Sequence, residues 1–284
     1  MKTLVLDKST LEAAPKGFLQ DRRGEFHFLL PGHLLHELAT EKLAQRHFMS
    51  PSEKEALDYK LQFLFKKAIH EAGGQWIGHT EALEWEITQG RSSRGMPTRD
   101  LSSLRSFKDL LQGKVLDHCN ELEAIYATAA SVPHDPRMER DFRELQCTPE
   151  ADLLKNFADK ARSQEYVMLL SQRASTLADL APQKGWTVSP NFHPGPGWFA
   201  YGMTLAGSLY LQWKWCKFGD APADRKKPAN PVFDLYYIAF MAITDGLLSS
   251  DTGMLELAWA AWPEKREDIY QYRMEKSALV RFNP

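Results

Sequence analysis

Residues 3–10, TLVLDKST, contain the pattern on which the fold depends. Residues 3–6 form a short β-prone and largely apolar run that stops abruptly at Asp7. A short run of this kind is typical of a strand that is buried on both faces of a parallel sheet. Ser9 can cap a short helix after the strand, because serine is a favoured capping residue. We therefore expect a strand over residues 3–6 and a helix after it.

The same order of elements recurs immediately downstream. Residues 26–30, FHFLL, form a second strand candidate, and Pro31 stands where a helix can begin. Leucines at helical spacing give that helix an apolar face, at positions 34, 35, 38 and 43. The order strand, helix, strand, helix predicts an α/β fold with a central parallel sheet.

The pattern changes in the middle of the chain. Ser50-Pro51-Ser52-Glu53 has the signature of a helix start with a capping box, and helical spacing continues through most of the following residues. Strand signals return only near the end, where residues 247–248 form a minimal strand between two helices. We expect an α/β core from residues 1–47 and 230–284, interrupted by a mainly α-helical insertion or lid over residues 48–229.

Composition restricts the class of protein. The chain has 284 residues, 43% of them hydrophobic, and a formal net charge of −2, so its overall charge does not favour nucleic acid, although local basic patches can bind phosphates. Three scattered cysteines without a C-x-x-C pair argue against a disulfide framework or a thiolate zinc site. No signal peptide or transmembrane run is evident, so we expect a cytoplasmic protein that does not contact a membrane.

Acidic residues follow the predicted strands. Asp7 ends the first strand, Asp251 lies just past the last one, Glu37 is on the helix after the second strand, and Asp234 opens the helix before the last strand. Ligands of open parallel sheets bind outside the carboxyl ends of the strands. If the two α/β segments form one sheet, all four carboxylates can meet at that edge.

Four ionised carboxylates in one place need a compensating positive charge, because like charges raise one another's pKa. Carboxylate oxygens suit Mg²⁺ or Mn²⁺, which polarise a phosphate and activate a bound water. Each acid also has a structural interpretation. Asp7 and Asp251 can be helix caps, and Glu37 can be a surface acid. Asp234 can be stabilised by the positive end of the helix dipole, because it lies in the first turn of its expected helix.

The arrangement resembles the PIN-domain nuclease family at these positions. LVLDKST resembles its first strand with a catalytic aspartate and a small polar residue, here Asp7 and Ser9. LLPGHLLHEL resembles its second segment, here with Glu37. FDLYYIAFMAITDGLLSSDTGMLELA resembles its third and fourth elements, which contribute Asp234 and a Ser-x-Asp step at residues 249–251. The match covers roughly residues 3–46 and 230–262.

The resemblance implies a three-layer α/β fold, a divalent metal and hydrolysis of phosphodiester bonds, most often in RNA. On that basis Asp7, Glu37, Asp234 and Asp251 are the expected catalytic and metal-binding residues. The auxiliary candidates around them are Ser9, Ser249, Asp245 and His33. Compact family members lack a region like residues 48–229, so the substrate preference of the family is a poor guide to the substrate of this chain.

Other enzyme classes lack their motifs. His33, His36 and Glu37 suggest a zinc helix, but their order is neither H-E-x-x-H nor H-x-x-E-H. Ser9 occupies the place of the second aspartate of a haloacid-dehalogenase phosphatase. No Walker A or G-x-G-x-x-G sequence is present.

The region over residues 48–229 offers residues for substrate phosphates or for a partner. The basic candidates are Arg94, Arg99, Arg225, Lys226 and Lys227, each of which can equally be solvated surface charge. The aromatic side chains at positions 186, 198, 199 and 201 are better suited to core packing than to base stacking. The alternative function is a non-catalytic PIN-like module whose helical region binds a protein, either a regulatory partner or a second copy.

Overall fold

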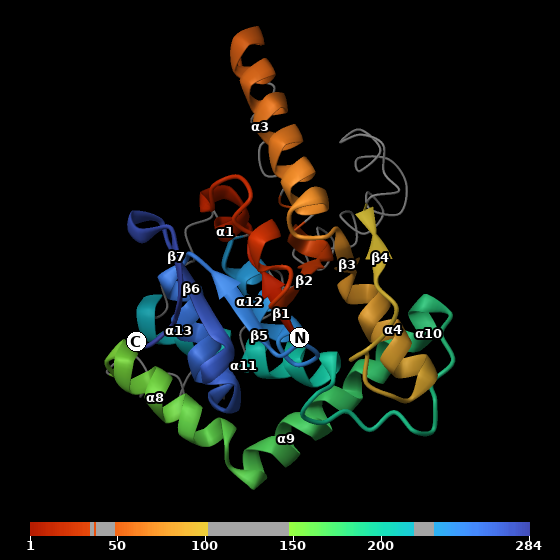
Figure 1. Cartoon of the computed structure of the whole chain (residues 1–284). Coiled ribbons are helices and arrows are strands. Elements are labelled where there is room, and N and C mark those ends of the chain that lie inside the picture. Colours follow the sequence, from red (N-terminus) through yellow and green to blue (C-terminus); the bar gives the residue numbers. More distant parts are fainter. Residues whose placement is uncertain (35–36, 38–48, 102–147, 219–229) are drawn as a thin grey trace.

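The structure is a computed structural model that describes residues 1–34, 37, 49–101, 148–218 and 230–284. Its strands form one mixed, mostly parallel sheet of seven strands in the order β4-β3-β2-β1-β5-β6-β7, with helices packed around it (Figure 1). The chain is therefore an α/β protein, as its first 46 residues predict.

The central strands are all parallel, and the two outermost strands are antiparallel. Leu4 in β1 pairs with Phe28 on one side and with Gly246 on the other. The antiparallel pairs are β3 with β4 and β6 with β7. The strands expected over residues 3–6, 26–30 and 247–248 are confirmed. The strand bounds are β1 (Lys2–Leu6), β2 (Phe26–Pro31), β3 (Gln75–Ile77), β4 (Arg99–Asp100), β5 (Gly246–Ser249), β6 (Ile269–Arg273) and β7 (Ala278–Arg281).

The α-helices are α1 (Lys8–Ala13), α3 (Pro51–His70), α4 (His79–Gln89), α8 (Glu150–Ala161), α9 (Gln164–Ser175), α10 (Ala181–Lys184), α11 (Phe199–Phe218), α12 (Asn230–Phe240) and α13 (Thr252–Ala261). Short 3-10 helices are η1 (Gln20–Arg22), η4 (Thr176–Leu180), η5 (Pro263–Asp268) and η6 (Met274–Lys276). The capping box between Ser50 and Glu53 is confirmed. The sequence also indicates helices at roughly residues 102–130 and 137–147, and these residues lie outside the described part of the chain.

The sheet extends into the region that was expected to be mainly helical. Strands β3 and β4 both lie within residues 48–229, and β3 pairs with the end of β2. The boundary at residue 47 therefore does not separate the sheet from the insertion. Strand β3 contains only the three residues QWI, and so short a strand shows no readable period. Strands β6 and β7 were likewise not predicted.

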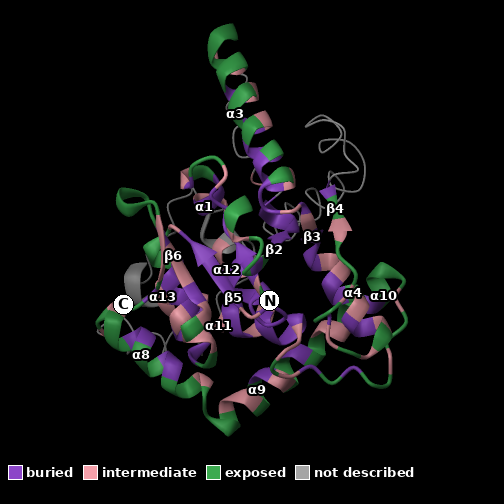
Figure 2. Cartoon of the chain, in the orientation of Figure 1, coloured by how far each residue is buried: buried purple, intermediate pink, exposed green. Residues whose placement is uncertain are grey.

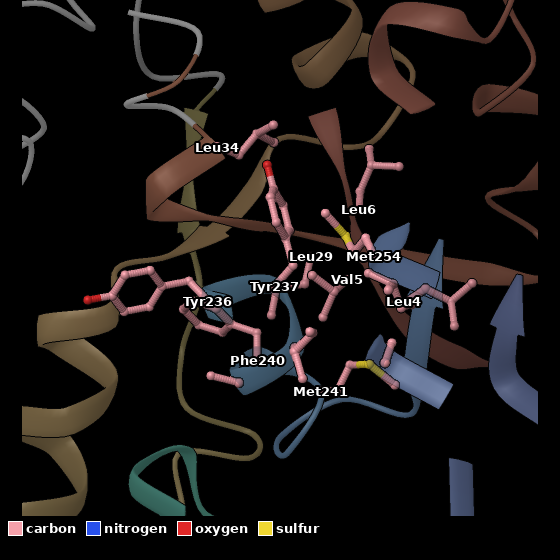
Figure 3. Close-up of a cluster of buried hydrophobic side chains, with 14 of the residues drawn as sticks. Leu4, Val5, Leu6, Leu29, Leu34, Tyr236, Tyr237, Phe240, Met241 and Met254 are labelled. Carbon is pink, nitrogen blue, oxygen red and sulfur yellow. The ribbon is translucent and has the colours of Figure 1, made fainter. Parts of the chain in front are cut away.

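The core lies around β1 and β5. Leu4, Val5, Leu6, Leu247 and Leu248 have no exposed surface, which explains why both strands have continuous apolar sequences (Figures 2 and 3). Helix α12 contacts β1 and β2, and α13 contacts β5 and β6. Each such leucine contributes on the order of 2 kcal/mol through burial. This packing fixes the positions of the two strands that carry the candidate site.

Helix α11 crosses α12 at very short range. A Cβ atom on Gly202 would lie 2.4 Å from the carbonyl oxygen of Ala239 and 2.8 Å from Cβ of Ala242, so only glycine permits the observed approach. Lys265 stabilises the segment directly after α12 by donating to the carbonyl oxygens of residues 241, 242 and 244. In the described part of the chain, no helix combines the length and the apolar character that crossing a membrane requires.

Candidate functional site

The strand order places a topological switch point beside β1. The parallel strands lie in the order β3-β2-β1-β5-β6, so the chain first builds outward from β1 on one side and later adds β5 and β6 on the other. Ligands of such sheets bind outside the carboxyl ends of the strands at the point where the order reverses. That point lies between the ends of β1 and β5, which are followed by Asp7 and by residues 250–251.

Two serines hold Asp7 at this edge. Ser249 donates a 2.6 Å hydrogen bond to Oδ2 of Asp7, and the Ser9 hydroxyl donates to the same oxygen. The two serine oxygens are 3.2 Å apart, and Ser9 Oγ also accepts from the N–H of Ser250. The resulting network joins the ends of β1 and β5 through side chains that were expected to be auxiliary.

Asp7 occupies the cap position of α1, but its side chain does not cap the helix. Instead it is almost fully buried at 3% exposure. Burial raises the pKa of its carboxyl group, the hydrogen bonds from Ser249 and Ser9 lower it, and the charge of Asp251 raises it further. Helix capping therefore does not explain this aspartate, and Ser9 is not the cap that the sequence suggested.

Asp251 does cap a helix. Its Oδ1 accepts a 3.2 Å hydrogen bond from the N–H of Met254 in the first turn of α13, and its own N–H donates to Ser249 Oγ at 2.9 Å. The residue is exposed, unlike Asp7. Its structural interpretation is thus correct, and its charge also acts on Asp7 and Asp234.

Glu37 approaches the same edge from the helical residues after β2. Its Oε2 accepts a 2.6 Å hydrogen bond from the hydroxyl of Tyr237 in α12. Burial raises the pKa of Glu37 to about 7, against the Tyr237 hydrogen bond and the positive charge of Lys8. The charges of Asp7 and Glu12 act in the same direction as burial. Glu37 is therefore not an isolated surface acid.

Asp234 has a strongly perturbed carboxyl group. Burial raises its pKa to about 8, and the charges of Asp251, Asp7 and Glu37 add to the shift. Among the described residues, no hydrogen-bond donor to its side chain is found. A partly buried carboxylate that faces three other acids without a donor is costly to ionise unless a cation is bound nearby. We call Asp7, Glu37, Asp234 and Asp251 the acidic cluster.

The acidic cluster suits a hard divalent cation in its charge and in its oxygen ligands. Three of its four side chains nonetheless already accept hydrogen bonds within the protein. Asp7 accepts from two serines, Glu37 accepts from Tyr237, and Asp251 accepts from the N-terminus of α13. Across the part of the chain that the structure describes, no three His, Cys, Asp or Glu side chains are grouped so that they could hold a metal ion. Metal binding would therefore require these carboxylates to adjust their rotamers.

The auxiliary candidate Asp245 lies at the opposite edge of the sheet. It precedes β5, its Oδ2 accepts from the N–H of Thr3, and its Oδ1 pairs with Arg94 at 2.7 Å. Arg94 therefore also lies near the amino ends of the strands, away from the acidic cluster. Arg99 pairs with Glu81 and stacks over Trp76. The basic candidates at positions 225, 226 and 227 lie outside the described residues.

His33 does not line an open groove, because it has no exposed surface. Its ring packs edge-on against Tyr237 at 4.1 Å between centroids and lies near Tyr236 and Phe240. Of the aromatic residues that could stack on bases, Phe199 and Tyr201 are buried in the core. Core packing, which the sequence favoured, accounts for them.

Two residues of this region were not singled out from the sequence. Tyr237 donates to Glu37, and the positive charge of Lys8 acts on the same carboxyl group. Tyr237 follows Asp234 by three positions, which places the two on one face of a helix, and this spacing is the signal that was available. Lys8 is adjacent to Asp7, but a single lysine at a helix start gives no such signal.

Comparison with known proteins identifies no relative. No protein-family model matches the chain, and neither a curated protein nor a solved structure is significantly similar to it.

Proposed function

We propose that this chain is a divalent-metal-dependent nuclease with a three-layer PIN-like fold, which hydrolyses phosphodiester bonds in RNA. The observation that carries the proposal is the position of the acids at the switch point, where Ser9 and Ser249 hold the Asp7 carboxylate at the ends of β1 and β5. Burial and the charges of the three other acids raise the pKa of Asp234 there to about 8. A carboxylate in this position is stabilised by a bound cation, and the switch point of the sheet is where ligands of such folds bind. The choice of RNA rests on the family resemblance.

The proposed residue roles follow from their contacts. Asp7 is the central ligand, because Ser9 and Ser249 fix its carboxylate at the ends of β1 and β5. Asp234 and Glu37 approach from α12 and from the residues after β2, and Asp251 adds negative charge from the start of α13. Mg²⁺ or Mn²⁺ held here would polarise the phosphate and lower the pKa of the attacking water.

Cleavage of fluorescently labelled single-stranded RNA and DNA, with Mg²⁺, Mn²⁺ or EDTA, tests the proposal. Wild-type protein should cleave RNA only with metal, and Asp7→Asn and Asp234→Asn should each remove cleavage while the protein remains folded. Asp245→Asn is the matched control, because it replaces an acid at the opposite edge of the sheet. Full cleavage activity of both Asp7→Asn and Asp234→Asn would contradict the site assignment.

The second candidate function is a non-catalytic module that binds a protein. Its support is a set of exposed apolar side chains on helices of the region over residues 48–229, with Tyr59 and Phe63 on α3 and Met168 and Leu169 on α9. Thermal stability with and without Mn²⁺ separates the two functions. A nuclease of the proposed kind gains melting temperature with Mn²⁺, whereas a module that neither gains stability nor cleaves RNA fits the second function.

A further inference from the structure

Helix α3 extends away from the sheet, well beyond the elements around it (Figure 1). Its C-terminal half is fixed to α1, because Lys60 pairs with Glu12 at 3.1 Å. The buried ammonium of Lys67 also donates to the carbonyl oxygens of residues 11 and 14, at the end of α1. The N-terminal half of α3 is largely exposed (Figure 2). The helix therefore presents a firmly anchored surface to the surroundings of the protein.

Apolar side chains lie on two opposite faces of α3. The buried face consists of Leu57, Leu61, Leu64, Phe65 and Ala68. The opposite face carries five exposed residues, which we call the outer stripe: Ala56, Tyr59, Phe63, Lys66 and His70. Their spacing alternates between three and four positions, which is the spacing by which two helices pack side by side. Tyr59 is 77% exposed and Phe63 is 42% exposed, so the two largest apolar side chains of the stripe are both open to contact.

Opposite charges lie at the two ends of the outer stripe. Glu55 is exposed next to the first residue of the stripe, and Lys66 is exposed near its end. Among the described residues, neither Glu55 nor Lys66 forms an ion pair. One end of the stripe is therefore acidic and the other end basic, with two aromatic side chains between them.

We propose that the outer stripe binds the outer stripe of a second copy of this chain, with the two α3 helices antiparallel. A twofold axis midway between Tyr59 and Phe63 places Tyr59 of each copy against Phe63 of the other. The same axis sets Glu55 of each copy level with residue 67 of the other, next to Lys66. Such a contact is self-complementary and closed, so it produces a dimer and not a chain of copies. The proposal concerns association and does not depend on the proposed nuclease activity.

The charges favour the antiparallel arrangement over the parallel one. Parallel helices in register would set Glu55 against Glu55 and Lys66 against Lys66, and like charges at helix contacts are destabilising. Antiparallel helices pair opposite charges and also oppose their dipoles. The contact is a single pair of helices and is small, so we expect a weak dimer with a dissociation constant in the micromolar range.

Sedimentation velocity of the full chain over a range of concentrations tests the proposal. Wild-type protein should pass from monomer to dimer as its concentration rises. Changing both Tyr59→Ser and Phe63→Ser should weaken dimerisation at least about 10-fold, because buried aromatic side chains dominate contacts of this kind. The matched control changes Met168→Ser and Leu169→Ser, which also removes two exposed apolar side chains, here from α9, and should leave the dimer unchanged. Equal dimerisation of the α3 variant and the wild type would overturn the proposal.

Charge reversal tests the orientation of the helices. Glu55→Lys and Lys66→Glu should each weaken dimerisation by about 5-fold or more, since each change converts two attractive contacts of the dimer into repulsive ones. The two changes combined in one chain should restore dimerisation, which a general loss of folding could not produce. A combined variant that dimerises no better than the single variants would refute the antiparallel contact.

Other occupants of the outer stripe give different results. Wild-type protein that remains monomeric up to about 100 μM would overturn the proposal. If Tyr59→Ser then lowers the melting temperature of that monomer, another part of the same chain covers the stripe. If the melting temperature does not change, the stripe is left for a different protein.

Discussion

The hydroxyl of Ser249 donates a 2.6 Å hydrogen bond to Oδ2 of Asp7, although 242 positions separate the two residues. Ser249 is the last residue of β5 and is fully buried, and Asp7 directly follows β1. The two residues meet because β5 is added beside β1 after the chain has passed through the rest of the molecule.

Replacing Ser249 by alanine tests how much this contact contributes. Ser249→Ala removes a donor to the Asp7 carboxylate and an acceptor for the N–H of Asp251. Loss of a hydrogen bond to a charged group should lower the free energy of unfolding by about 1.5–3 kcal/mol and should reduce RNA cleavage. Urea denaturation and the cleavage assay measure both effects. Ser250→Ala, at the adjacent position, is the control, and equal effects of the two changes would contradict the assigned contact.

The acidic cluster should make the metal-free protein less stable as pH rises. The pKa of Asp234 is raised from 3.8 to about 8 and that of Glu37 from 4.5 to about 7, so the native state binds more protons than the unfolded state between these values. Stability from these groups is therefore present below the unfolded pKa and is lost as pH rises to about 8, by up to about 1.4 kcal/mol per pH unit per extra proton.

Asp234→Asn should flatten this dependence because the amide does not titrate. In EDTA it should raise the melting temperature near pH 8 and change it little near pH 4, and scanning calorimetry measures both. Mn²⁺ should stabilise the wild type more near pH 8 than near pH 5, since protons compete with the cation. A melting temperature of metal-free wild type that rises steadily from pH 5 to pH 8 with the same slope as Asp234→Asn would contradict the coupling.

Glu86 stabilises the contact between α4 and α11. Its side chain has no exposed surface, and its carboxylate accepts four hydrogen bonds of 2.7–2.9 Å. Two come from the N–H and the hydroxyl of Ser93, and two come from the N–H groups of Phe199 and Ala200 at the start of α11. Glu86→Ala should lower the free energy of unfolding by about 3–5 kcal/mol, because it leaves buried donors without a partner. Glu84→Ala changes an exposed glutamate of the same helix and should have an effect of less than about 0.5 kcal/mol. Chemical denaturation measures both, and equal values would refute the role.

Gly202 and Gly207 provide a matched pair within α11. Gly202→Ala places a methyl group 2.4 Å from the carbonyl oxygen of Ala239, so it should destabilise the protein by about 1–3 kcal/mol through displacement of α12. Gly207→Ala meets nothing within 4 Å and should be neutral or stabilising by up to about 1 kcal/mol. Because α12 carries Asp234, Gly202→Ala should also weaken RNA cleavage. Similar melting temperatures for the two variants would show that α11 and α12 tolerate separation.

The central strands were predictable because burial on both faces leaves a continuous apolar sequence, as in residues 3–6 and 247–248. Strand β3 was not predictable, since three residues between two glycines are too few to show a hydrophobic period. They become a strand only by pairing with β2. For the acids, the positions of Asp7, Glu37, Asp234 and Asp251 after or beside apolar strands marked them as candidates, but the sequence left helix capping open as another explanation. In the structure the side chain of Asp251 caps α13. The side chain of Asp7 caps no helix and instead accepts hydrogen bonds from two serines.

By itself, the sequence determined that apolar strands end in acidic residues and that helices begin beside them, because these are properties of short segments. Only the tertiary structure decided which ends meet. Pairing of β1 with both β2 and β5 brings residues from opposite ends of the chain to one edge, and it takes Asp245 and Arg94 to the other. The contact of Tyr237 with Glu37 spans 200 positions, and no local pattern specifies it, since it depends on the packing of α12 against the sheet.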